Sequence, residues 1–138
     1  MNTTVRLPLL ALLVTLLAAC SSTPTWEGMS QTDISAWKGL GLDAGAAQEL
    51  AEEGIGPQEA KGWMDNGITA VDDILDWKKE GFTVANSEGW VANGFDLDAA
   101  TEWNEEKFTA DEAKTWIDGG FDLDDAVKNR TKGLAPVE

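Results

Sequence analysis

The chain has 138 residues, with 25 acidic and 10 basic side chains and a formal net charge of −15 at pH 7. A surface this acidic repels nucleic acid and anionic lipid head groups, and it suits a basic or cationic partner. The absence of histidine excludes imidazole as a general base, and a single cysteine excludes an internal disulfide.

The first 19 residues have the pattern of a secretory signal peptide. Arg6 supplies a positive charge, and the run that follows it as far as Ala19 is almost wholly apolar. This run is short for a membrane span and ends in small residues, as signal peptides do. The segment Leu17-Ala18-Ala19-Cys20 resembles the lipobox of bacterial lipoproteins.

This resemblance implies that residues 1–19 are cut off and that Cys20 becomes the acylated first residue of the mature protein. It also implies three acyl chains, which anchor a protein stably, whereas one chain holds it only marginally. Ser21 stands where, in enterobacterial-type sorting, an aspartate favours the inner membrane. We therefore expect a lipid anchor in the outer membrane, with the protein facing the periplasm or the cell surface. The alternative is a secreted protein with one free thiol.

Residues 20–28 are polar, and they predict a short flexible tether between the anchor and a folded domain. Removal of the signal takes away Arg6 and no acid, so the mature chain is more negative still. Its length corresponds to one domain.

From residue 29 the sequence repeats with a period of about thirteen residues. In most units a Trp stands four residues before a glycine and five before a Phe, Ile or Leu, and Leu50 replaces the Trp once. The fourth unit has one extra residue, which either shifts the following helices or is absorbed in a turn. The units are 29–41, 42–54, 55–67, 68–81, 82–94, 95–107, 108–120 and 121–133.

Each unit predicts one helix of about ten residues, roughly 15 Å long. The second residue of the unit is the predicted N-cap, because Ser, Thr and Asp side chains accept a hydrogen bond from a free backbone N–H. The last residue is glycine, which suits the left-handed conformation just past a helix end, except that Lys107 ends the sixth unit. The predicted N-caps are Ser30, Asp43, Gly56, Thr69, Thr83, Asp96, Thr109 and Asp122.

This register places the repeated Trp near the helix end, where the apolar residue after the glycine can cover it. Because helices this short are marginal alone, they must pack on one another. We predict an all-α fold: a tandem array of about eight short helices over residues 29–134, either an open α-solenoid or a compact bundle. Asn129, beside Lys128 and Arg130, predicts a polar terminal cap, and residues 135–138 predict a loose tail.

The repeated Trp residues have two interpretations. Exposed indoles can stack on sugar rings, which would suit contact with peptidoglycan. The alternation of Trp with Leu50 favours packing instead, so we predict that these residues form the core.

Two acidic segments could bind calcium, because Asp96-Leu97-Asp98 and Asp122-Leu123-Asp124-Asp125 place carboxylates at predicted turns. The twelve-residue calcium loop is absent, however, and these acids also fit N-caps and first helical turns. We expect no metal and no cofactor. Adjacent acids on a helix point about 100° apart and do not form a glycosidase pair, so we expect no enzyme activity.

These observations predict a lipid-anchored, acidic helical-repeat lipoprotein that binds or scaffolds a protein of the bacterial cell envelope. One alternative is a structural lipoprotein that contacts glycan or peptidoglycan, and a further one is a calcium-dependent binding protein. Lys107 marks either a strained functional position or simply a less ideal helix end. Cys20 is the one site residue that the sequence names, and the binding face stays unassigned.

Overall fold

The computed structural model describes residues 23–136, and over that range it contains eight α-helices of nine residues each and no strand. The predicted all-α fold is confirmed. No helix within these residues is long and apolar enough to cross a membrane. The helices are α1 (Gln31–Gly39), α2 (Ala44–Glu52), α3 (Pro57–Asp65), α4 (Val71–Lys79), α5 (Val84–Ala92), α6 (Leu97–Glu105), α7 (Ala110–Asp118) and α8 (Leu123–Thr131).

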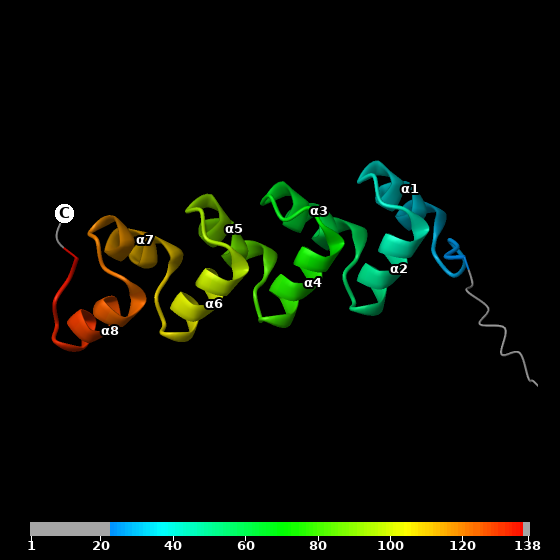
Figure 1. Cartoon of the computed structure of the whole chain (residues 1–138). Helices are drawn as coiled ribbons and strands as arrows, with labels where there is room; N and C mark the ends of the chain where they lie inside the picture. The colour runs from blue at the N-terminus through cyan, green and yellow to red at the C-terminus, as the bar shows by residue number, and fades with distance from the viewer. Residues whose placement is uncertain (1–22, 137–138) are drawn as a thin grey trace, which may run out of the picture.

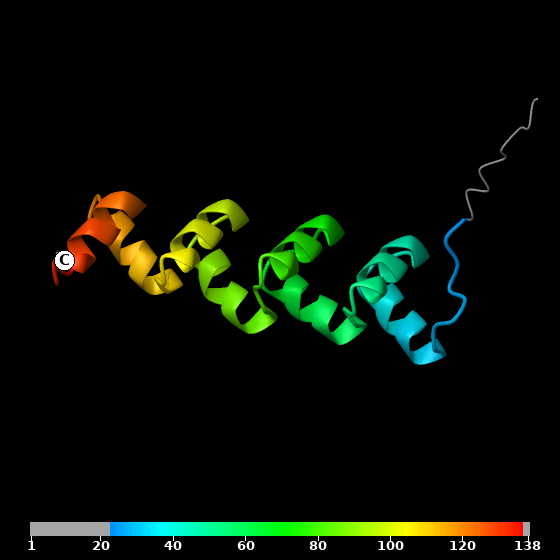
Figure 2. The ribbon, with the colours of Figure 1, turned by 90° about the horizontal axis from the view of Figure 1, so that it is seen from below.

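The helices form an elongated array of stacked two-helix hairpins rather than a compact bundle (Figure 1). The odd-numbered helices lie in one layer and the even-numbered helices in the other. Helices pack on the second-next helix along the chain: α1 on α3, α2 on α4, α3 on α5 and α5 on α7. Figure 2 shows α1 and α8 at opposite ends of the array. Of the two predicted arrangements, the open solenoid is therefore the one found.

The helix starts follow the predicted caps in every unit except the fourth. Side chains of Ser, Thr or Asp at these positions accept a hydrogen bond from the backbone N–H three residues later, as Asp43 does from Ala46 at 3.0 Å. The predicted N-cap Thr69 is wrong, because α4 begins after Ala70. The extra residue of the fourth unit thus lies in the turn, and the later helices keep their register.

The helix ends form the predicted Schellman turns. The glycine after each helix has a positive φ, between 73° and 95°, and Lys107 takes the same conformation with φ 65°. The N–H of the following apolar residue donates to the carbonyl of the repeated Trp position, for example from Ile68 to Trp63 at 3.0 Å. The last helix does the same with Leu134 and Asn129, also at 3.0 Å.

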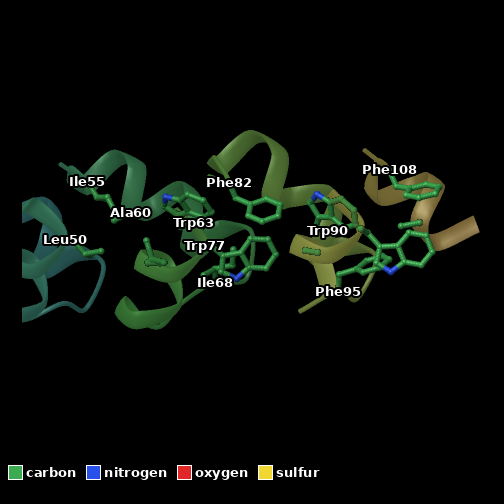
Figure 3. Close-up of a cluster of buried hydrophobic side chains, with 14 of the residues drawn as sticks. Leu50, Ile55, Ala60, Trp63, Ile68, Trp77, Phe82, Trp90, Phe95 and Phe108 are labelled. Atoms are coloured by element: carbon green, nitrogen blue, oxygen red, sulfur yellow. The ribbon is translucent and has the colours of Figure 1, made fainter. Parts of the chain in front are cut away.

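The repeated Trp residues form the core, as predicted. Each of the six is at most 5 % exposed, and Leu50 is fully buried. Four of them meet the Phe five residues later edge to face, with ring centroids 4.8 to 5.3 Å apart. Figure 3 shows two of these pairs, Trp77 with Phe82 and Trp90 with Phe95, following one another along the array. Small residues at the fourth helical position, such as Ala60 and Ala113, are also fully buried and let the helices approach closely.

The two layers differ at the sixth position of their helices. In the odd helices this residue is small: Ala36, Gly62, Gly89 and Thr115. In the even helices it is charged: Glu49, Asp76, Glu102 and Lys128. A Cβ added to Gly62 would lie 2.7 Å from Cγ1 of Val84 on α5. The structural repeat is therefore a hairpin of two helices, with a closely packed odd layer.

Two glycine substitutions test this close packing. Glycine inside a helix normally costs about 0.5–1 kcal/mol relative to alanine. Gly39→Ala should therefore raise the free energy of unfolding by at most that amount, because Gly39 is the last residue of α1 and no atom lies within 4 Å of the added Cβ. Gly62→Ala should lower it by about 1–2 kcal/mol, because the new methyl overlaps stiff Val84. Urea unfolding followed by circular dichroism measures both, and a double variant with Val84→Ala should recover part of the loss. Equal stabilisation by both alanines would contradict the close approach of α3 and α5.

Arg130 of α8 caps the end of α6. Its guanidinium donates to the carbonyls of Glu106 and Lys107, the latter at 3.2 Å, and its Cζ lies 3.6 Å from the ring centroid of Phe108. A cation at this place stabilises the negative end of the helix dipole and the free carbonyls. Lys128 and Arg130 stand in the last turn of α8, where the terminal cations were predicted, and Arg130 also serves a helix two positions earlier.

Lys107 is the one non-glycine residue with positive φ among residues 23–136. A side chain in this conformation costs about 1–2 kcal/mol, part of which the lower chain entropy of the unfolded state offsets. Lys107→Gly should thus raise the free energy of unfolding by about 0.5–1 kcal/mol. Gly94→Lys, at the preceding helix end, is the matched reverse change and should lower it. A Lys107→Gly protein that unfolds more easily in urea would show instead that the lysine makes a stabilising contact.

Candidate binding surface

The predicted lipidation site, Cys20, and the signal before it lie outside the described residues. Residue 23 lies at the α1 end of the array (Figure 1). Of the predicted tether, residues 23–28 are described, and they lie against the first hairpin. Trp26 is half-buried against the core, with Lys38 Nζ 5.4 Å from its ring centroid.

The two acidic segments considered for calcium sit at helix starts. The carboxylates of Asp96 and Asp122 each accept a backbone N–H at 2.9 Å, from Ala99 and Asp125, and so act as N-caps. Within residues 23–136, no three potential metal ligands gather in one place.

The six repeated indoles are not a stacking platform, because their faces are covered by neighbouring side chains. The interpretation of these residues as core is confirmed. Any binding surface must therefore be built from other residues.

A cleft opens in the even layer between α4 and α6, which pack more loosely than the neighbouring odd helices. Its apolar floor includes Trp77, Val91, Phe95 and Leu97. Its rim carries carboxylates on both sides, and a second hollow continues it along α6. The acids and the one hydroxyl of this α4–α6 cleft are Asp73, Asp76, Glu80, Asp96, Asp98, Thr101 and Glu102.

The same cleft recurs between α6 and α8, displaced by one hairpin. At most lining positions the residue 26 positions later is of the same kind, so that Glu102 stands for Asp76 and Ile117 for Val91, whereas Ala99 stands for Asp73 and Val127 for Thr101. Ile117 is 44 % exposed, although large apolar residues are usually buried. The other corresponding residues of this α6–α8 cleft are Trp103, Phe121, Asp122, Leu123 and Asp124.

A charged residue at the sixth helical position lines the cleft, although α2, with Glu49 at that position, still packs on α4. In the odd layer, small Gly62 lets the next odd helix approach, whereas Asp76 at the same position of α4 is exposed and faces the cleft. The sequence contains this alternation of small and charged residues at the sixth helical position. The alternation is informative only when each helix is compared with the second-next helix along the chain. Sequence reasoning from single units missed it.

The N-terminal segment lies on the first hairpin. Pro24 would lie 3.3 Å from a Cβ at Gly45, the second residue of α2. Gln48, the fifth residue of α2, donates through Nε2 to the backbone carbonyl of Thr25 at 2.6 Å. The corresponding residues of α6 are Asp98 and Thr101, which both line the α4–α6 cleft. Pro24 and Thr25 thus cover a face of α2 in the first hairpin. The corresponding face of α6 is open in the α4–α6 cleft.

No protein-family model matches the chain, and no curated protein or solved structure matches it.

Proposed function

We propose that the protein is a lipid-anchored, acidic helical-repeat lipoprotein of the bacterial cell envelope that binds or scaffolds another protein. The observation that carries the binding role is the repeated cleft, which combines an apolar floor with an acidic rim in two successive hairpins. Repeat arrays commonly bind through such an extended surface.

The acids of the even layer support this role because none of them forms an ion pair among residues 23–136, although Lys78 and Lys79 line a hollow next to Asp76. The three ion pairs found within residues 23–136 use Glu59, Asp65 and Asp118, all on odd helices. The rim acids Asp76 and Asp98 are exposed and form no ion pair there. Concentrated charge of one sign attracts a partner of the opposite sign and speeds its association.

The position of the clefts suits an anchored module. The described chain starts at the α1 end, on the side of Cys20 in the sequence, whereas both clefts lie in the later helices (Figure 1). The acidic body is repelled by anionic lipid head groups, which keeps it away from the membrane surface. A partner can then reach the clefts without competing with the bilayer.

Site-specific photo-cross-linking in intact cells tests the binding role. A photoreactive residue is placed at exposed positions outside and within the clefts. Gln58 and Glu88 of the odd layer line neither cleft, whereas Asp98 on α6 and Ile117 on α7 line the α4–α6 and α6–α8 clefts. We expect a discrete cross-linked protein that is recovered in the envelope fraction. If no position captures a discrete protein, the binding role is wrong.

A further inference from the structure

We infer that the α4–α6 cleft and its α6–α8 copy bind an extended cationic segment of polypeptide that carries apolar side chains between its Lys or Arg residues. This inference rests on the proposed binding role and names its face and the chemistry of its partner.

The lining of the two clefts determines the side chains of the partner. Among the described residues that line them, none is basic and carboxylates surround the apolar floor. Asp76 and Asp98 stand on opposite walls of the first cleft, on α4 and α6. Val91 and Leu97, both half-buried, lie on the floor between them. A bound segment therefore needs cationic groups toward the rim and an apolar group toward the floor.

The N-terminal segment of the chain shows how a peptide can lie on this face. Pro24 lies near the second position of α2, and the carbonyl of Thr25 accepts a hydrogen bond from Gln48 at the fifth position. Trp26 then packs beside Lys38, the eighth residue of α1. The eighth residue of α5 is Val91, which lies on the floor of the α4–α6 cleft. On the first hairpin, the N-terminal segment thus makes contact through both a main-chain carbonyl, that of Thr25, and an apolar side chain, that of Trp26.

Thr101 offers the corresponding donor in the open cleft. It is the fifth residue of α6, and its Oγ1 is buried without a hydrogen-bond partner among the described residues. Other helical hydroxyls in the array bond to their own helix: Ser35 donates to the Gln31 carbonyl at 2.8 Å, and Thr115 to the Asp111 carbonyl at 2.7 Å. A buried hydroxyl without a partner is costly, and rotation of the Thr101 side chain toward the cleft would let a carbonyl of a bound segment satisfy it.

The test uses full-length protein in detergent and a fluorescent nine-residue peptide of three Lys-Leu-Pro repeats, whose prolines keep it extended. We expect saturable binding in low salt, measured by fluorescence anisotropy. A peptide with Glu in place of Lys should not bind. Spermine, which has charge but neither a carbonyl nor an apolar side chain, should compete poorly.

Matched variants separate the cleft from net charge. Asp76→Asn with Asp98→Asn should weaken binding of the peptide about tenfold. Glu52→Gln with Glu88→Gln removes the same charge at exposed sites that line neither cleft, and it should weaken binding by no more than about twofold. Thr101→Val should weaken binding about three- to tenfold without lowering the melting temperature, because it removes a hydroxyl that has no partner.

Equal weakening by the two double variants, or spermine competing as well as the peptide, would overturn the inference in favour of nonspecific attraction. Failure of the peptide to bind would overturn it as well.

The same double variants, combined with the photo-cross-linking positions, distinguish a failure of the cleft inference from a failure of the proposed binding role. A partner that is captured equally with and without Asp76 and Asp98 contradicts the cleft but keeps the binding role. Loss of capture in the Asp76→Asn and Asp98→Asn protein, with capture retained in the matched control, supports both.

Discussion

Trp63→Ala is expected to lower the free energy of unfolding by about 3–5 kcal/mol, the range for removing a large aromatic side chain from a core. Trp63 has no exposed surface and lies on α3, which packs on both α1 and α5. Its loss should thus loosen contacts on both sides of the helix.

The damage is expected to spread because the helices depend on one another. A nine-residue helix is marginal in water, and each unit of an array is held by its neighbours. Loss of α3 would leave the first hairpin with little support, while α5 to α8 could still pack together. Circular dichroism during urea titration should accordingly show an early partial loss of helix, before the later helices unfold.

Trp63→Leu is the matched control, because Leu50 is fully buried at the same position of α2. We expect a smaller loss, about 1–3 kcal/mol. The indole Nε1 of Trp63 is buried without a hydrogen-bond partner in the described part of the chain, so its removal costs no hydrogen bond. If Trp63→Ala unfolds at the urea concentration of the unmodified protein, the core assignment of this residue is wrong.

Cys20→Ser is expected to abolish acylation completely. The change keeps the size of the side chain but removes the thiol to which, by the lipobox resemblance, the first acyl chains are attached. Each buried methylene of a lipid anchor contributes about 0.8 kcal/mol, so an unacylated protein loses its stable hold on the membrane.

Metabolic labelling with palmitate in an enterobacterial host measures this effect. Label should enter the unmodified protein and the control Ser22→Ala, and it should be absent from Cys20→Ser. In the same host, Ser21→Asp should move the labelled protein from the outer to the inner membrane. Labelled fatty acid that persists in Cys20→Ser would show that the anchor lies elsewhere.

The helices, their ends and the core could be predicted from the sequence because each depends on neighbours within one unit. A glycine, the apolar residue after it and the Trp before it form one local turn, and their spacing repeats. The fourth helix start was misplaced because Thr69 is a good capping residue by itself. In the structure, α4 starts one residue later than predicted, after Ala70. This start places the buried Ile74 at the fourth helical position.

The candidate site could not be predicted in this way because it depends on helices that are two apart. Asp76 and Asp98 line one cleft only because α4 and α6 lie in the same layer. The cap that Arg130 provides for α6 joins residues 23 and 24 positions apart, and no local pattern connects them. Thr101 was also missed, since a threonine within a helix has no special meaning until its hydroxyl is found buried without a partner.

The unequal packing of the two layers has a mechanical consequence. We expect the odd layer, where Gly62 lets α3 and α5 approach closely, to resist stretching more than the even layer from α4 to α8, whose helices pack more loosely. Thermal bending of the rod should therefore occur mainly in one plane, with the odd layer as its stiff spine. Curvature and cleft width would then change together, so that a segment bound in one cleft, as proposed, would alter the width of the next.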